Sequence, residues 1–100
     1  MTADEIKKYR EEKIKNLKYT KPYKDFLKYI ERKLLISIDN DPCVTTVPIA
    51  IPPDRHARLD HNIPDNINLC VIHDILVDDY GYNVKFTYEG KTEFICIILE

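Results

Sequence analysis

Residues 21–34 read KPYKDFLKYIERKL and carry the clearest helical periodicity in the chain. At about 100° per residue, their apolar side chains fall on one helix face and their basic side chains on the opposite face. The apolar face holds Tyr23, Phe26, Leu27, Ile30 and Leu34, and the basic face holds Lys21, Lys24, Lys28 and Arg32. Pro22 suits a first helical turn, where its missing N–H breaks no hydrogen bond. We therefore predict an amphipathic helix whose apolar face anchors the core.

A second, more highly charged helix is predicted before this one. Thr2 and Glu5 have the spacing of a capping box, in which the two side chains satisfy backbone donors at a helix start. The helix should run to about Leu17. Its apolar stripe is thin and consists of Ile6, Tyr9, Ile14 and Leu17. We expect residues 1–18 to form a peripheral charged helix of a single domain that spans residues 1–100.

Two strands are predicted after the amphipathic helix. Residues 35–38, LISI, are followed by the turn sequence DNDP, and residues 44–51 then resume an apolar alternation. Pro48 lies within the second of these strands. Because proline cannot donate to a sheet ladder, its position should face an open edge or a bulge.

The C-terminal half predicts one more helix and a hairpin. Asp65 is placed to cap a helix from Asn66 to Asp79, with Gly81 as its stop, and a strand at 67–72 is the alternative. Residues 82–88 alternate apolar and polar side chains, Glu89-Gly90 predicts a tight turn, and 94–99 is a continuous apolar run. The predicted fold is α+β: two N-terminal helices, then ββαββ around a small, mainly antiparallel sheet.

The final run, FICIIL at residues 94–99, has two alternative interpretations. At a sheet edge, its open backbone groups and two apolar faces would pair with another chain. In the centre of the sheet, it would be enclosed within one molecule.

Charge is distributed unevenly along the chain. Residues 1–33 hold eleven Lys or Arg against six Asp or Glu, whereas the remainder holds four against eleven, which together give the net charge of −2. Such asymmetry indicates a partner-binding surface, and the two ends of separate copies would complement each other.

The three cysteines are Cys43, Cys70 and Cys96, and their wide spacing is typical of small buried side chains rather than of a disulfide framework or zinc site.

Composition adds two expectations. Ile, Lys, Asn, Asp and Tyr are abundant while Gly and Ala are scarce, which is typical of AT-rich genomes such as those of many viruses and phages. The first residues are acidic and lack the apolar segment of a secretory signal, and no apolar run is long enough for a membrane span. We expect an intracellular protein that is not secreted and makes no membrane contact.

The basic face of residues 21–33 is the first candidate site. A row of cations can neutralise phosphates, and tyrosines can stack on bases. The candidate residues are Lys18, Lys21, Lys24, Lys28, Arg32 and Tyr29. The alternatives are a solvated face opposite a buried one, which the acidic Asp25 and Glu31 favour, and a surface for an acidic protein.

The segment 52–65, PPDRHARLDHNIPD, is predicted to be a long loop and is the second candidate site. Its acidic, basic and imidazole groups are Asp54, Arg55, His56, Arg58, Asp60 and His61. Such groups can ligate a divalent metal or transfer protons, but their spacing matches no zinc signature and solvated loops collect the same residue types. His73, in the predicted third helix, fits a core or boundary position.

From these patterns we expect a small, non-catalytic intracellular binding or adaptor protein, without cofactor or metal, whose partner is a protein and includes a second copy of itself as a homodimer. The main alternative is a nucleic-acid-binding accessory protein that uses the basic helix 21–33. A metal-dependent enzyme that uses the loop 54–61 is a more distant alternative.

Overall fold

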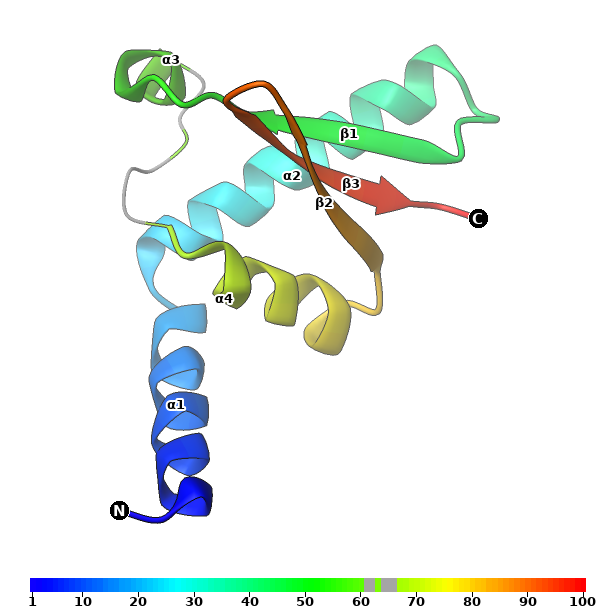
Figure 1. Cartoon of the computed structure of the whole chain (residues 1–100). Helices are drawn as coiled ribbons and strands as arrows, with labels where there is room; N and C mark the ends of the chain where they lie inside the picture. The colour runs from blue at the N-terminus through cyan, green and yellow to red at the C-terminus, as the bar shows by residue number, and fades with distance from the viewer. Residues whose placement is uncertain (61–62, 64–66) are drawn as a thin grey trace.

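The computed structural model describes residues 1–60, 63 and 67–100, and it shows an α+β fold (Figure 1). Two N-terminal helices precede a small antiparallel sheet, as predicted. The helices are α1 (Ala3–Lys18), α2 (Lys21–Asn40), α3 (Arg55–Asp60) and α4 (Leu69–Asp74), which continues as the π-helical turn η1 (Ile75–Asp79). The strands are β1 (Thr46–Ile51), β2 (Asn83–Glu89) and β3 (Thr92–Ile98).

The sheet has the order β1-β3-β2, and both pairs are antiparallel. The C-terminal run therefore lies in the central strand, so of the two interpretations the strand enclosed within one molecule is correct and the open edge is not. Gly90 has φ 64° in the tight turn between β2 and β3, a left-handed conformation that glycine adopts without a Cβ penalty. β1 lies at an edge, where the missing amide hydrogen of Pro48 is tolerated, as predicted.

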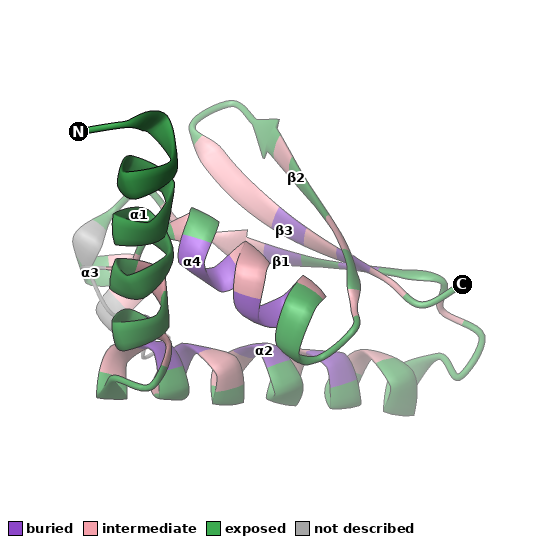
Figure 2. Ribbon diagram, turned by 90° about the horizontal axis from the view of Figure 1, so that it is seen from below, coloured by how far each residue is buried: buried purple, intermediate pink, exposed green. Residues whose placement is uncertain are grey.

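One face of the sheet packs on α2 and α4 (Figure 2). Val47 pairs with Ile97 and Ile49 with Ile95, so these four buried side chains point to the same side. The core beneath the sheet is completed by Tyr23, Phe26, Ile30 and Leu34 of α2, by Val71, Ile72, Ile75 and Leu76 of α4 and η1, and by Ile63. Phe26 has 0% of its surface exposed. The predicted burial of the apolar face of α2 is confirmed.

Residues 35–38 belong to α2, so their prediction as a strand is wrong. The described residues consequently form three strands, not four. A helix-stopping signal comes only at Asp41-Pro42, where the following proline disfavours helical backbone and Asp41 adopts φ −148° and ψ 97°. Isoleucine's preference for strands is a weak local effect, and a helix already anchored by Leu34 overrides it.

The segment predicted as a long loop contains the short helix α3, so that prediction is wrong for Arg55–Asp60. The backbone N–H of His56 donates to the Asp54 carboxylate at 3.0 Å, which organises the start of this helix. The predicted cap Asp65 lies outside the described residues. Asn68 caps α4 instead, because its side-chain oxygen accepts the N–H of Cys70 at 2.8 Å, and the strand alternative for 67–72 is wrong.

Helix α1 projects from the rest of the molecule (Figure 1). Thr2 caps it by accepting the N–H of Glu5 at 3.3 Å, as the capping-box spacing predicted. Within α1 every residue is exposed except Ile14 and Lys18, which are half-buried. Ile14 packs at the margin of the core, and Lys18 Nζ lies 3.4 Å from an Asp79 carboxylate oxygen.

Truncating Phe26 should destabilise the protein severely. We expect Phe26→Ala to lower the free energy of unfolding by about 3–5 kcal/mol, because the lost ring leaves a cavity beneath the sheet. Urea unfolding followed by circular dichroism measures this change. A midpoint equal to that of the wild type would contradict the central place of α2 in the core.

Deleting residues 1–18 should cost less stability than Phe26→Ala. Apart from the partly buried Ile14 and Lys18, α1 leaves its side chains in solvent, so little apolar area is lost with it. The same urea titration compares the two variants. A larger loss for the deletion than for Phe26→Ala would show that α1 is needed by the core.

Candidate protein-binding groove

An apolar groove of about 620 Å³ runs along α2, next to the face that is buried in the core. One wall is α2 itself, and the other is formed by η1, the turn that leads into β2, and the residue after β3. The lining side chains are Lys24, Leu27, Lys28, Ile30, Glu31, Leu34, Leu35, Ile38, Leu76, Tyr80, Tyr82 and Leu99. The groove therefore joins segments that are distant in the sequence.

The spacing of the α2 residues sets the shape of this groove. The α2 side chains that line the groove follow one another three or four residues apart, which places them along one side of the helix; they include Leu27, Glu31, Leu34, Leu35 and Ile38. From Leu27 to Ile38 the helix advances about 16 Å at 1.5 Å per residue. The wall is thus a mainly apolar row roughly three turns long, with Glu31 within it, and it has the length of a short helical segment.

The opposite wall depends on the turn after η1. Gly81 has φ 74°, and its N–H donates to the Val77 carbonyl oxygen at 3.2 Å. This turn brings Tyr80 and Tyr82 together, with ring centroids 6.5 Å apart in an edge-to-face arrangement. The backbone N–H of Tyr82 donates to the Leu76 carbonyl oxygen at 2.8 Å and ties the turn to η1.

Large apolar side chains of the groove are strongly exposed. Leu35 keeps 55% of its surface in solvent and Tyr80 59%, and Ile38 and Leu99 are also exposed. Single exposed apolar residues are ordinary, but a contiguous group around one hollow marks an interaction surface. Leaving such a row in water is unfavourable unless another molecule covers it.

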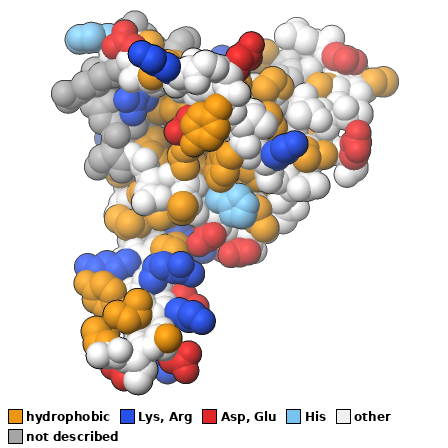
Figure 3. Space-filling model, in the orientation of Figure 1, with side chains coloured by type: hydrophobic (Ala, Val, Ile, Leu, Met, Phe, Trp, Pro, Cys, Tyr) orange, Lys and Arg blue, Asp and Glu red, His pale blue; other side chains and the backbone are white. Residues whose placement is uncertain are grey.

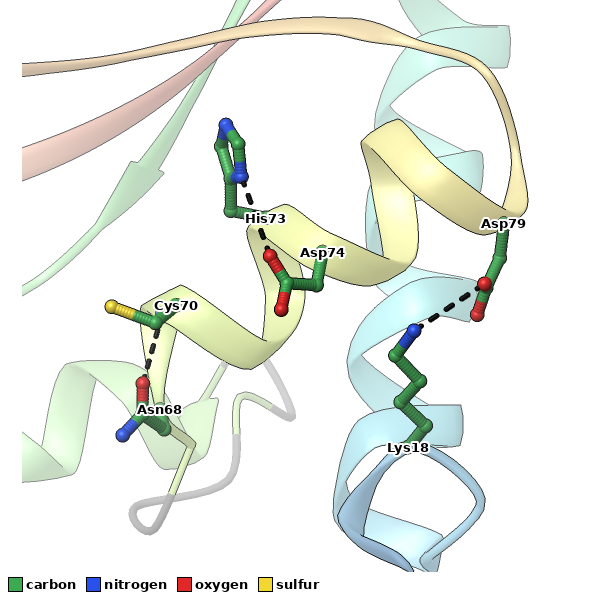
Figure 4. A network of polar contacts seen from close by, with 6 residues as sticks. All are labelled: Lys18, Asn68, Cys70, His73, Asp74 and Asp79. Atoms are coloured by element: carbon green, nitrogen blue, oxygen red, sulfur yellow. Dashed lines mark hydrogen bonds and ion pairs between the residues drawn. The ribbon is translucent and has the colours of Figure 1, made fainter. Parts of the chain in front are cut away.

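The predicted basic row lies beside this groove. Lys21, Lys24, Lys28 and Arg32 are all exposed on α2, and Lys24 and Lys28 also line the groove together with Glu31. Lys18 is separate from the row, because it belongs to α1 and pairs with Asp79 (Figure 4). The apolar strip that includes Leu35 and Ile38 was not predicted, because residues 35–38 were expected to form a strand. Their helical spacing from Leu27 was the available signal.

Tyr29 does not offer the open ring that base stacking would require. It is half-buried and stacks on Phe26 with ring centroids 5.9 Å apart. Lys33 Nζ lies 5.6 Å from the Tyr29 ring centroid, within the range of a cation–π contact. Burial raises the pKa of the Tyr29 hydroxyl above its usual 10.0.

The second candidate site is used largely for local structure. Asp54 caps α3, and the Arg58 guanidinium donates to the Pro53 carbonyl oxygen at 3.0 Å. Arg55 and Asp60 are the end residues of α3, His56 is exposed, and His61 lies outside the described residues. Among the residues whose placement is described, three or more His, Cys, Asp or Glu side chains do not gather where they could hold one metal ion.

A second hollow, of about 610 Å³, lies between α1, α4 and β2. His73 lines it half-buried, with its ring 5.6 Å from that of Phe86 and its Nδ1 3.8 Å from an Asp74 carboxylate oxygen (Figure 4). Cys70 lines it too and is exposed, as is Cys43, so the expected burial of these two cysteines is wrong. His73 therefore occupies a boundary position of the kind expected from the sequence.

The projecting α1 carries charges of both signs between apolar side chains (Figure 3). Tyr9 is exposed, with Lys13 Nζ 5.4 Å from its ring centroid. This mixture makes α1 neither a continuous basic surface nor a continuous apolar one. The groove along α2 is the more coherent candidate site.

Comparison with known proteins adds no assignment: no family model, no curated protein and no solved structure matches this chain. In the described ranges of the chain, none of the helices combines the length and the apolar character that a membrane span requires.

The partly buried Tyr29 hydroxyl should make the stability of the fold depend on pH above 10. The pKa of Tyr29 is raised in the folded state, so the unfolded chain loses this proton at a lower pH than the folded protein does. The free energy of unfolding therefore falls as the pH rises past 10.0. The pKa of Tyr88 is raised as well, by a hydrogen bond to Glu93 and then by the charge of that carboxylate. We expect Tyr29→Phe to reduce the loss of stability above pH 10, without abolishing it, in urea titrations at successive pH values. An unchanged pH dependence in Tyr29→Phe would contradict the effect.

Proposed function

We propose that this protein is a small, non-catalytic protein-binding module and that the groove along α2 is its binding surface. The observation that carries the proposal is the exposure of Leu35, Ile38 and Tyr80 around a single hollow. A row of apolar side chains at helical spacing, facing a second apolar wall, is the arrangement that accepts an amphipathic helix.

The composition of the groove supports binding rather than chemistry. Its lining is mainly apolar and includes a few charged side chains, and protein interfaces likewise combine a largely apolar surface with polar and charged groups. Among the described residues that line it, the ionisable groups are Lys24, Lys28, Glu31 and two tyrosines. The long stems of the lysines can pack on an apolar partner while their ammonium groups stay in water.

A second candidate function is nucleic-acid binding by Lys21, Lys24, Lys28 and Arg32. Their common exposure on one side of α2 favours it. Phosphate binding by such a row would weaken steeply as salt concentration rises and would not require Leu35. Titration of a fluorescent DNA duplex at several salt concentrations tests this candidate directly.

Leu35 and its neighbour Ile36 provide a matched test of the groove. Both are exposed, at 55% and 48%, but only Leu35 is among the groove-lining residues. We expect tagged wild-type protein and Ile36→Glu to retain the same bound protein from the cell that naturally makes this chain. Leu35→Glu should retain at least about ten-fold less, because a charge would have to be buried in the apolar centre.

Quantitative mass spectrometry of the retained proteins, with an untagged copy of the chain present, measures this difference. Circular dichroism confirms that both variants remain folded. Equal retention by Leu35→Glu and Ile36→Glu would contradict the use of the groove as the binding surface.

A further inference from the structure

We infer that the occupant of the α2 groove is the α2 helix of a second copy of this chain, packed antiparallel about a two-fold axis between Lys28 and Glu31. This inference rests on the proposed function, because it names the partner of the same surface. In a two-fold dimer the same patch must serve on both molecules, so the groove has to complement itself in shape and in charge.

The order of charges along α2 supplies the direction of packing. Its first half carries Lys21, Lys24 and Lys28 on one side. Arg32 and Lys33 follow in the second half, but the last charged residues are acidic, namely Asp39 and the cap residue Asp41. By helical spacing, Lys21 and Asp39 fall within about 20° of Lys28 around the axis. An antiparallel partner therefore places its acidic end against the basic start of α2, while a parallel partner would oppose lysine to lysine.

The centre of the helix fits the same arrangement. Lys28 and Glu31 are one turn apart, and both line the groove. A two-fold axis that passes between them sets Lys28 of each copy beside Glu31 of the other. The symmetry produces this ion pair twice. In the same register, the numbers of two residues that face each other across the contact add up to about 59 or 60, so Lys21 also lies near Asp39 of the second copy.

The apolar groups complete the match. Leu35 projects from α2 with 55% of its surface exposed, and the groove beside it is lined by Leu27, Tyr80 and Leu99. With the two helices antiparallel, Leu35 of each copy lies against the stem of Lys24 on the other and points toward that apolar hollow. The exposed apolar row and the hollow are thus covered in both molecules by one contact.

The test is the solution mass of charge-reversed variants. We expect the wild type to have twice the 11.8 kDa chain mass in sedimentation equilibrium at micromolar concentration. Lys28→Glu alone and Glu31→Lys alone should each weaken the dimer about ten-fold or more, since each opposes like charges twice. The double variant Lys28→Glu/Glu31→Lys, and an equimolar mixture of the two single variants, should recover the dimer.

Leu35→Glu should give the monomer mass, and Ile36→Glu should dimerise like the wild type. A wild-type monomer throughout the micromolar range would overturn the inference. So would charge variants that dimerise as tightly as the wild type, or a mixture of the two single variants that does not recover the dimer.

The dimer and the proposed function can fail separately. If the wild type is a monomer and Leu35→Glu still loses another retained protein, only the identity of the partner is wrong and the proposed function stands. Retention that is insensitive to Leu35 removes the proposed function itself.

Discussion

Burial of one face of α2 against the sheet and α4 is the contact on which the rest of the structure depends. Phe26 and Ile30 lie at its centre, beneath the paired side chains of Val47 with Ile97 and Ile49 with Ile95. Packing against a helix is one of the ways in which so small a sheet becomes stable, because the helix covers the apolar face of the sheet. The hydroxyl of Tyr23, also on this face, accepts the N–H of Asn68 at 2.9 Å and links α2 to the start of α4.

The groove is a consequence of the same contact. The sheet and η1 cover the buried side of α2, while the adjoining side, with Leu35 and Ile38, receives only the edge of η1 and the C-terminal residues. The twenty residues of α2 thus have two neighbouring faces with different surroundings. One face holds the domain together, and the other leaves an apolar strip between lysines.

The charge asymmetry of the sequence takes on a more specific form in the structure. The basic surplus of residues 1–33 is divided between the projecting α1 and the exposed side of α2, and Lys18 of α1 is drawn into a pair with Asp79. Lys24 and Lys28 of α2 line the apolar groove, whereas Arg10 of α1 lines the hollow between α1, α4 and β2. Because apolar contact supplies affinity and charge supplies orientation, this side of α2 is the better candidate for recognition.

Local chemistry explains what the sequence by itself determined. The capping pair Thr2 and Glu5, the amphipathic face around Phe26 and the turn at Gly90 depend on near neighbours, and all three were predicted correctly. The assignment of residues 35–38 and the central place of β3 were decided by tertiary structure. An apolar run satisfies a helix or a strand equally well, and strand order depends on which distant surfaces it covers, so only packing could make that choice. The groove follows from the helical conformation of residues 35–38, because Leu35 and Ile38 share a side of α2 with Leu27 only when the helix continues past Leu34.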